Sequence, residues 1–155
     1  VKGEAAERVS ANAFTFEEFL ANEAKAGRLN LPLKKIADRA LVHGHCHQKA
    51  FDAFSPVETV LKLVPELKVE TVESSCCGMA GSFGYNEETI DVSLAMGELS
   101  LLPAVRKADA STIVVADGTS CRHQIKDGAL SRDRGERQSR DGGRRGGEAR
   151  AKDRD

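Results

Sequence analysis

The feature that most constrains this chain is a pair of adjacent cysteines, Cys76 and Cys77, followed by Gly78, Gly81 and Gly84. Adjacent cysteines rarely form a disulfide with each other, because the ring that they would close is strained. Glycine allows positive φ and lets the backbone pass close to a bulky group. The stretch is therefore unsuited to an ordinary core and indicates a loop with a chemical role.

The two remaining cysteines lie in comparable polar segments. Cys46 stands between His45 and His47, and His123 follows Cys121 by two residues. Thiolates are soft ligands that suit zinc and iron–sulfur clusters. In a chain without a secretory signal, clustered cysteines more often bind metal or do redox chemistry than form disulfides. We expect the three segments to meet at a metal centre. The candidate cofactor-binding residues are Cys46, Cys76, Cys77 and Cys121, and the candidate metal ligands also include His123, His45 and His47.

The histidines beside Cys46 pose a geometric problem. In an extended chain, neighbouring side chains point to opposite faces, so His45 and His47 would point away from the face of Cys46. All three can reach one metal only if the backbone turns locally, which Gly44 would allow. Otherwise we expect the imidazoles to hold a thiolate or relay a proton from beside the ligands.

Three short apolar runs predict strands at residues 39–43, 67–72 and 112–116. Each run leads into a cysteine segment, and helical patterns separate the runs. In open α/β sheets, ligands bind at the carboxyl edge of the strands. We therefore predict an α/β fold, with a small and mostly parallel sheet flanked by helices and a disordered C-terminal tail.

Helices are predicted from apolar periodicity and end signals. The first covers residues 14–26 with Thr15 as its cap, and the second has Ser55 as its cap and Pro56 at its first position. The third runs from residue 86 to about residue 101. Its expected buried residues are Ile90, Leu94, Met96 and Leu99.

Three regions are predicted along the chain. Because the sequence starts at Val1 rather than Met, we expect a fragment and interpret residues 1–13 as a linker from a missing upstream region. Residues 14–130 form the cysteine-rich α/β domain. Residues 131–155 contain no apolar residue larger than alanine, and such a segment cannot bury enough surface to offset its ordering entropy. We expect that Arg/Gly-rich tail to be disordered.

Charge and hydropathy exclude some classes. Residues 1–130 carry 14 Lys and Arg against 18 Asp and Glu, so we expect no nucleic-acid partner. No apolar run approaches the roughly 20 residues that span a bilayer, and no signal peptide is recognisable. We expect a cytoplasmic location with at most peripheral association with the inner membrane.

The motifs His45-Cys46-His47, Cys76-Cys77-Gly78 and Cys121-Arg122-His123 resemble the Cys-Cys-Gly cysteine-rich domain. That domain occurs in heterodisulfide reductase, in the iron–sulfur subunits of glycolate oxidase and anaerobic glycerol-3-phosphate dehydrogenase, and at the carboxyl end of fused FAD-linked oxidases similar to D-lactate and D-2-hydroxyglutarate dehydrogenases. The resemblance covers about residues 10–130. It implies that the four cysteines hold an iron–sulfur cluster, such as 4Fe–4S. The family pattern ends in Cys-x-x-Cys, whereas this chain has Gln124 at the last position. A four-thiolate cluster, a zinc site and His123 as a substitute ligand therefore stay open.

The resemblance also implies a function. The chain would be the carboxyl-terminal electron-transfer domain of an FAD-linked oxidoreductase that acts on a 2-hydroxy acid, and would be inactive alone. Its partners would be upstream FAD and ferredoxin-like domains and an electron acceptor. The alternative is a zinc-stabilised module that docks a redox partner. A third hypothesis is a dithiol enzyme that uses Cys76 and Cys77 directly.

Overall fold

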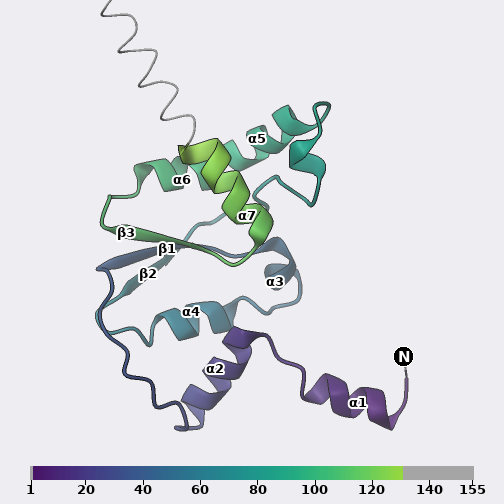
Figure 1. The fold of residues 1–155 in the computed structure, drawn as a ribbon, viewed down its shortest axis with the longest axis vertical. Coiled ribbons are helices and arrows are strands. Elements are labelled where there is room, and N and C mark those ends of the chain that lie inside the picture. The colour runs from purple at the N-terminus through teal and green to yellow at the C-terminus, as the bar shows by residue number, and fades with distance from the viewer. Residues whose placement is uncertain (1, 131–155) are drawn as a thin grey trace, which may run out of the picture. The chain divides into compact units, whose positions relative to one another are not determined.

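A computed structural model of the chain describes residues 2–130, which fall into two compact units. Of the described residues, unit 1 comprises residues 2–71 and Asp109–Val115, and unit 2 comprises Val72–Ala108 and residues 116–130. Figure 1 shows the course of the chain through both. The predicted disordered tail at residues 131–155 lies outside the described residues.

Unit 1 contains a three-stranded sheet of β1 (Arg39–His43), β2 (Lys68–Thr71) and β3 (Thr112–Ala116), in the order β2-β1-β3 (Figure 1). β1 and β2 run parallel, with Arg39 opposite Lys68. The prediction of an α/β fold with a small parallel sheet is confirmed. The first and third predicted strands have the observed bounds, and the second is one residue shorter at each end.

The sheet of unit 1 packs against α4 (Ser55–Leu61) through an apolar cluster. Its buried members are Ala40, Val42, Val57 and Leu67. The predicted Ser55 cap is wrong by one residue. The Val57 N–H bonds to the Phe54 carbonyl at 3.0 Å, so Phe54 occupies the capping position and Ser55 is already helical. Pro56 lies in the first turn, where its missing N–H costs nothing.

Three further helices belong to unit 1: α1 (Glu4–Ala11), α2 (Phe16–Lys25) and α3 (Cys46–Ala50). The predicted cap of α2 is confirmed, because the Thr15 side chain accepts the Glu18 N–H while the Glu18 carboxylate accepts the Thr15 N–H. α2 packs against α4 (Figure 1). α1 was not predicted, since its small polar residues show no clear periodicity.

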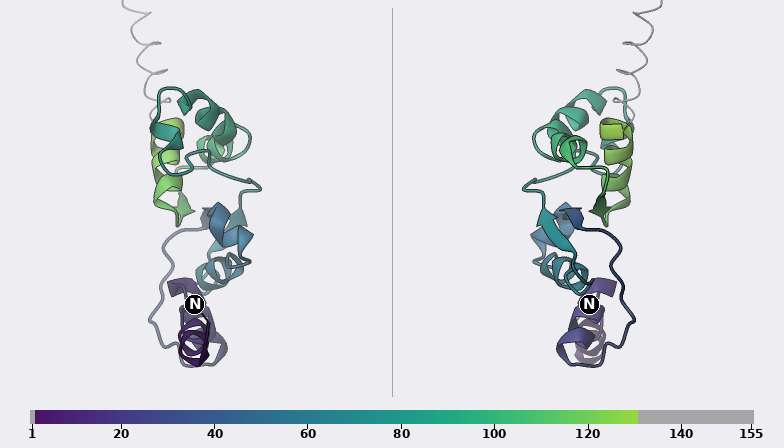
Figure 2. Two further views of the ribbon diagram at one scale, coloured as in Figure 1. Left: turned by 90° about the vertical axis from the view of Figure 1, so that its right-hand side faces the viewer. Right: turned by 90° about the vertical axis from the view of Figure 1, so that its left-hand side faces the viewer.

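Unit 2 is built from helical elements around its own apolar cluster. These are α5 (Ile90–Glu98), α6 (Leu101–Lys107) and α7 (Thr119–Gln124), with a 3₁₀ turn η1 (Phe83–Tyr85) and a π-helical turn η2 (Ile125–Leu130). Figure 2 shows α7 and η2 as one continuous rod. The buried apolar residues of this cluster are Cys77, Met79, Leu101, Leu102, Val105, Cys121, Ile125 and Ala129.

The helix predicted from residue 86 to about residue 101 is observed as α5 with shorter bounds, and α6 was not predicted. The chain breaks between α5 and α6, because Pro103 lacks an N–H and its ring would collide with the Leu99 carbonyl in a continuous helix. The predicted buried face of α5 is wrong in part. Leu99 is 80% exposed and Ile90 is 39% exposed, whereas the buried residues of α5 are Ser93 and Gly97. Leu94 and Met96 are half-buried.

Membrane-spanning helices require both length and apolarity. Among residues 2–130, no helix meets both requirements.

Candidate metal centre

Two cysteine sulfurs lie close together inside unit 2. Cys77 lies in the loop between β2 and η1, and Cys121 lies in α7. The two side chains are 3% and 1% exposed, and their Sγ atoms lie within 4.8 Å of one another. Both belong to the apolar cluster of this unit. Packing of unit 2 therefore joins two of the three predicted cysteine segments.

Cys76 contributes a third sulfur to the same part of unit 2. Its half-buried side chain packs against the apolar cluster that holds Cys77 and Cys121. Its Sγ accepts a hydrogen bond from the Gly78 N–H at 3.3 Å. The vicinal pair thus has one buried sulfur and one that receives a backbone donor.

The glycine loop after the vicinal pair closes onto α5. Gly78 has a φ of +92°, and a Cβ there would lie 2.1 Å from the Ser93 carbonyl oxygen. A Cβ at Gly84 would lie 2.3 Å from the Met79 sulfur. The expectation that glycine permits positive φ and close approach therefore holds at Gly78. The group that it approaches is the backbone of a neighbouring helix.

Gln124, the residue at the position of the family's last cysteine, is a buried amide beside this loop, and its hydrogen bonds were not predicted. Gln124 is 1% exposed, and its Nε2 donates to the Ser93 carbonyl at 2.9 Å and to the Ser93 Oγ at 3.2 Å. Gln124 lies three residues after Cys121 in α7, so the two side chains share a helix face. That spacing was the available sequence signal.

Cys46 belongs to unit 1, where it is the first residue of α3 and half-buried. It follows β1 closely, and His43, the last residue of that strand, is 1% exposed. Cys46 therefore lies just beyond the carboxyl end of a strand, as predicted. Its approach to the other three sulfurs stays a prediction.

The backbone at His45, Cys46 and His47 is not extended, because it forms the capping turn and the start of α3. His45 is the cap of α3, its Nδ1 accepts the His47 N–H at 3.3 Å, and its own N–H donates to the Gln48 side chain at 3.2 Å. The two imidazoles meet edge to face, with ring centroids 5.0 Å apart. Because Nδ1 of His45 serves the cap, Nε2 is the nitrogen through which His45 would bind a metal. Ligand roles for His45 and His47 stay predictions.

The structure places His123 on the exposed side of α7. Successive helical residues are rotated by about 100°, so His123 and the buried Cys121 lie on nearly opposite faces. His123 Nδ1 is hydrogen-bonded to the Tyr85 hydroxyl, and the two rings are 6.2 Å apart. Sequence reasoning missed this pair. It brings His123 to Tyr85 and away from the sulfur of Cys121.

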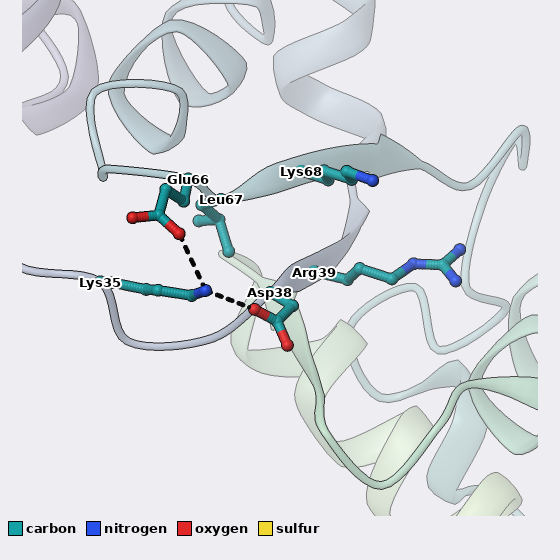
Figure 3. A pocket seen from close by; sticks show the side chains of 6 residues that line it. All are labelled: Lys35, Asp38, Arg39, Glu66, Leu67 and Lys68. Carbon is teal, nitrogen blue, oxygen red and sulfur yellow. Dashed lines mark hydrogen bonds and ion pairs between the residues drawn. The ribbon is translucent and has the colours of Figure 1, made fainter.

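A second candidate site in unit 1 has different chemistry. A pocket of about 550 Å³ is lined by Lys35, Asp38, Arg39, Glu66, Leu67 and Lys68 (Figure 3). The Lys35 ammonium bridges Asp38 at 2.7 Å and Glu66 at 3.0 Å. Its hydrogen bonds to these two carboxylates raise the pKa of Lys35, and the Lys35 bond lowers the pKa of Asp38. The pocket lies at the amino ends of β1 and β2 and contains no sulfur ligand.

Comparison with known proteins now defines the class. The family model named CCG, a cysteine-rich domain, matches residues 40–126, which is more than half of the chain. This chain belongs to that cysteine-rich domain family. The matched span runs from β1 to just beyond α7 and includes all four cysteines.

Curated relatives are dehydrogenases or parts of them. One of the subunits of anaerobic glycerol-3-phosphate dehydrogenase from Escherichia coli K12 is 31% identical over 98 residues, which are 62% of this chain and 24% of the relative. The D-2-hydroxyglutarate dehydrogenase of the same strain is 31% identical over 114 residues, 72% of this chain and 11% of the relative. The enzyme of that name from Haemophilus influenzae is 32% identical over 123 residues, 74% of this chain and 12% of the relative. The chain thus spans a quarter or less of these relatives. No solved structure matches significantly.

Proposed function

We propose that this chain is the electron-transfer domain of an FAD-linked oxidoreductase that acts on a 2-hydroxy acid. The observation that carries the proposal is the close pair of Cys77 and Cys121 sulfurs, with Cys76 packed against the same cluster. Iron–sulfur clusters that carry electrons are held by cysteine thiolates. Membership of the cysteine-rich family and likeness to two kinds of dehydrogenase support the same class.

The donor set fits a soft metal. Thiolates bind zinc at about 2.3 Å, so two that share one ion are at most about 4.6 Å apart. The Cys77 and Cys121 sulfurs, within 4.8 Å of each other, need little movement to meet that limit. Cys76 would supply a third thiolate and Cys46 a fourth. When bound, an iron–sulfur cluster supplies one-electron transfer.

The residues of this chain prepare those ligands. Thiols must lose their protons before they bind metal, and the Gly78 N–H already donates to the sulfur of Cys76. Met79, Leu101 and Leu102, all less than 3% exposed, belong to the cluster around Cys77 and Cys121. An apolar surrounding of this kind controls solvent access and thereby tunes the potential of a redox centre. Rigid packing of the sulfurs is the contribution of the fold.

The remainder of the proposed reaction lies in the parent protein. An upstream FAD domain would oxidise the 2-hydroxy acid, a ferredoxin-like domain would relay electrons, and this domain would pass them to an acceptor. The likeness to D-2-hydroxyglutarate dehydrogenase, whose substrate is a 2-hydroxy acid by its name, supports the substrate class. The chain alone would therefore be catalytically inactive. The cytoplasmic location stays a prediction.

The test is anaerobic reconstitution of the reduced full chain with iron and sulfide. We expect a coloured protein with acid-labile sulfide and, after reduction, an EPR signal. Cys121→Ser should abolish both, and the control Ser75→Ala, beside the vicinal pair, should retain both. A colourless chain with one zinc and no sulfide would instead support the docking module. A chain that takes up no metal and whose Cys76 and Cys77 are alkylated much faster than Cys121 would support the dithiol enzyme.

A further inference from the structure

The starting observation is a pair of buried polar side chains in unit 2. Among the described residues of that unit, Ser93 and Gln124 are the buried polar side chains, and they are bonded to each other. A buried polar group needs such a partner, because an unsatisfied donor loses its hydration without compensation. Both lie beside the cysteine loop, which suggests a role beyond packing.

The Gln124 amide occupies a space that is open because Gly78 and Gly97 have no side chains. Its Nε2 makes two hydrogen bonds to Ser93, to the carbonyl at 2.9 Å and to the hydroxyl at 3.2 Å, which uses both amide hydrogens. A Cβ added at Gly78 or Gly97 would come within 3.1 Å or 3.2 Å of that nitrogen. A Cβ at Gly97 would also lie 3.2 Å from the Cys77 carbonyl oxygen. The Gln124 side chain therefore links α7 to α5, and it lies against the turn of Cys77 and Gly78.

We propose that Gln124 is a positioning residue for the cysteine site. Gln124 and Cys121 are three residues apart in α7, and both are 1% exposed. Holding Gln124 on Ser93 holds this helix against α5, so the Cys121 sulfur stays within 4.8 Å of that of Cys77. This inference rests on the proposed function only in one respect, namely that the two sulfurs bind a metal.

The first test measures how often the sulfurs become accessible. Gln124→Leu keeps the approximate size and shape of the side chain and removes its donor. In the reduced, metal-free full chain, alkylation by iodoacetamide is followed at each cysteine by peptide mass spectrometry. Losing a buried hydrogen bond shifts an opening equilibrium by about tenfold, so Cys121 and Cys77 should react about tenfold faster.

Two controls distinguish a local effect on the positions of Cys121 and Cys77 from destabilisation of the whole chain. Thr119→Val removes an exposed hydrogen bond to Arg122 on the same helix and should leave all rates unchanged. Cys46 in unit 1 is the internal control and should react at the same rate in every variant. Unchanged rates at Cys121 and Cys77 in Gln124→Leu would overturn the proposal. Equal acceleration at Cys46 would overturn it too, because the whole chain would then have loosened.

A milder variant keeps the test decisive if Gln124→Leu does not fold. Ser93→Ala removes the 3.2 Å bond to the hydroxyl and leaves the 2.9 Å bond to the carbonyl. We expect an acceleration of about threefold at Cys121, the effect of losing a weak hydrogen bond. No acceleration in a folded Ser93→Ala chain would contradict the coupling of these two side chains.

A spectroscopic readout distinguishes this inference from the proposed function. Co²⁺ is titrated into the reduced chain while thiolate-to-cobalt charge-transfer absorption is recorded. Gln124→Leu should weaken Co²⁺ binding at least tenfold, as losses beside metal ligands typically do, and Thr119→Val should not. An equal affinity in wild type and Gln124→Leu would contradict the positioning role. Absence of thiolate absorption in the wild type would instead count against the proposed function, and the alkylation rates would still decide the role of Gln124.

Discussion

At Gly78, a single hydrogen atom in place of a side chain permits the loop to reach α5. Positive φ costs other residues about 1–2 kcal/mol, and a Cβ here would also lie 2.1 Å from the Ser93 carbonyl oxygen. We predict that Gly78→Ala lowers the free energy of unfolding by about 3 kcal/mol or more, measured by urea denaturation of the full chain.

Gly81 provides the matched control for this prediction. Its φ is +66°, and no atom lies within 4 Å of a Cβ built there. Gly81→Ala should therefore cost about 1 kcal/mol, from backbone conformation alone. Equal losses for the two variants would show that the approach to Ser93 does not matter.

The ion pairs of Figure 3 predict a pH effect at Asp38. The Lys35 ammonium lowers the pKa of Asp38 below its ordinary value of 3.8, so the pair stabilises the folded chain above that value. The stabilisation is lost as pH falls through the lowered folded-state pKa. Lys35→Met should raise the pKa of Asp38 toward 3.8, followed by NMR titration of its carboxyl carbon. The neighbouring Lys34→Met should leave it unchanged, and an unshifted Asp38 in Lys35→Met would refute the assignment.

Ser93 shows why burial was mispredicted within α5. Hydrophobicity alone favoured Ile90 and Leu99 as the inward residues, but the side that packs is the one with small residues, Ser93 and Gly97. Close approach of the cysteine loop leaves no room for a large side chain there. Which face of this helix turns inward therefore depends on its neighbours in space.

At the scale of elements, α2 depends on its capping box. Thr15→Ala removes the side-chain acceptor of the Glu18 N–H, and losing such a cap typically costs about 1 kcal/mol. We predict faster amide hydrogen exchange in the first turn of α2, with little change in the strands. Ser10→Ala, a similar change in α1, should leave exchange in α2 unchanged, and unaltered exchange in Thr15→Ala would contradict the cap.

The break between α5 and α6 was predictable from sequence. A proline restricts the residues before it and belongs in the first turn of a helix, and Pro103 is the third residue of α6. Leu99, which precedes this helix, is 80% exposed because the chain turns there. The predicted helix ended at about residue 101, before this proline, so the element that the sequence analysis did not predict is α6 itself.

At the scale of the whole molecule, each unit has its own apolar core. Leu102 of unit 2 is 0% exposed, and truncating a buried leucine costs about 2–5 kcal/mol. We predict that Leu102→Ala lowers the free energy of unfolding by that amount and that amides of α7 lose protection from exchange first. Leu99→Ala, at an 80% exposed position, should change stability by no more than about 0.5 kcal/mol. Similar losses for the two leucines would contradict this core.

The strands at residues 39–43 and 112–116 and the Thr15 cap followed from sequence alone, because each depends on residues near one another in the chain. The three cysteine segments were also recognisable from residue types and glycine spacing, and their role as metal ligands stays a prediction. Tertiary structure decided that the sulfurs of Cys77 and Cys121 are neighbours and that His123 turns toward Tyr85. Distances between remote residues depend on how helices pack, and here that packing includes the buried bond between Gln124 and Ser93.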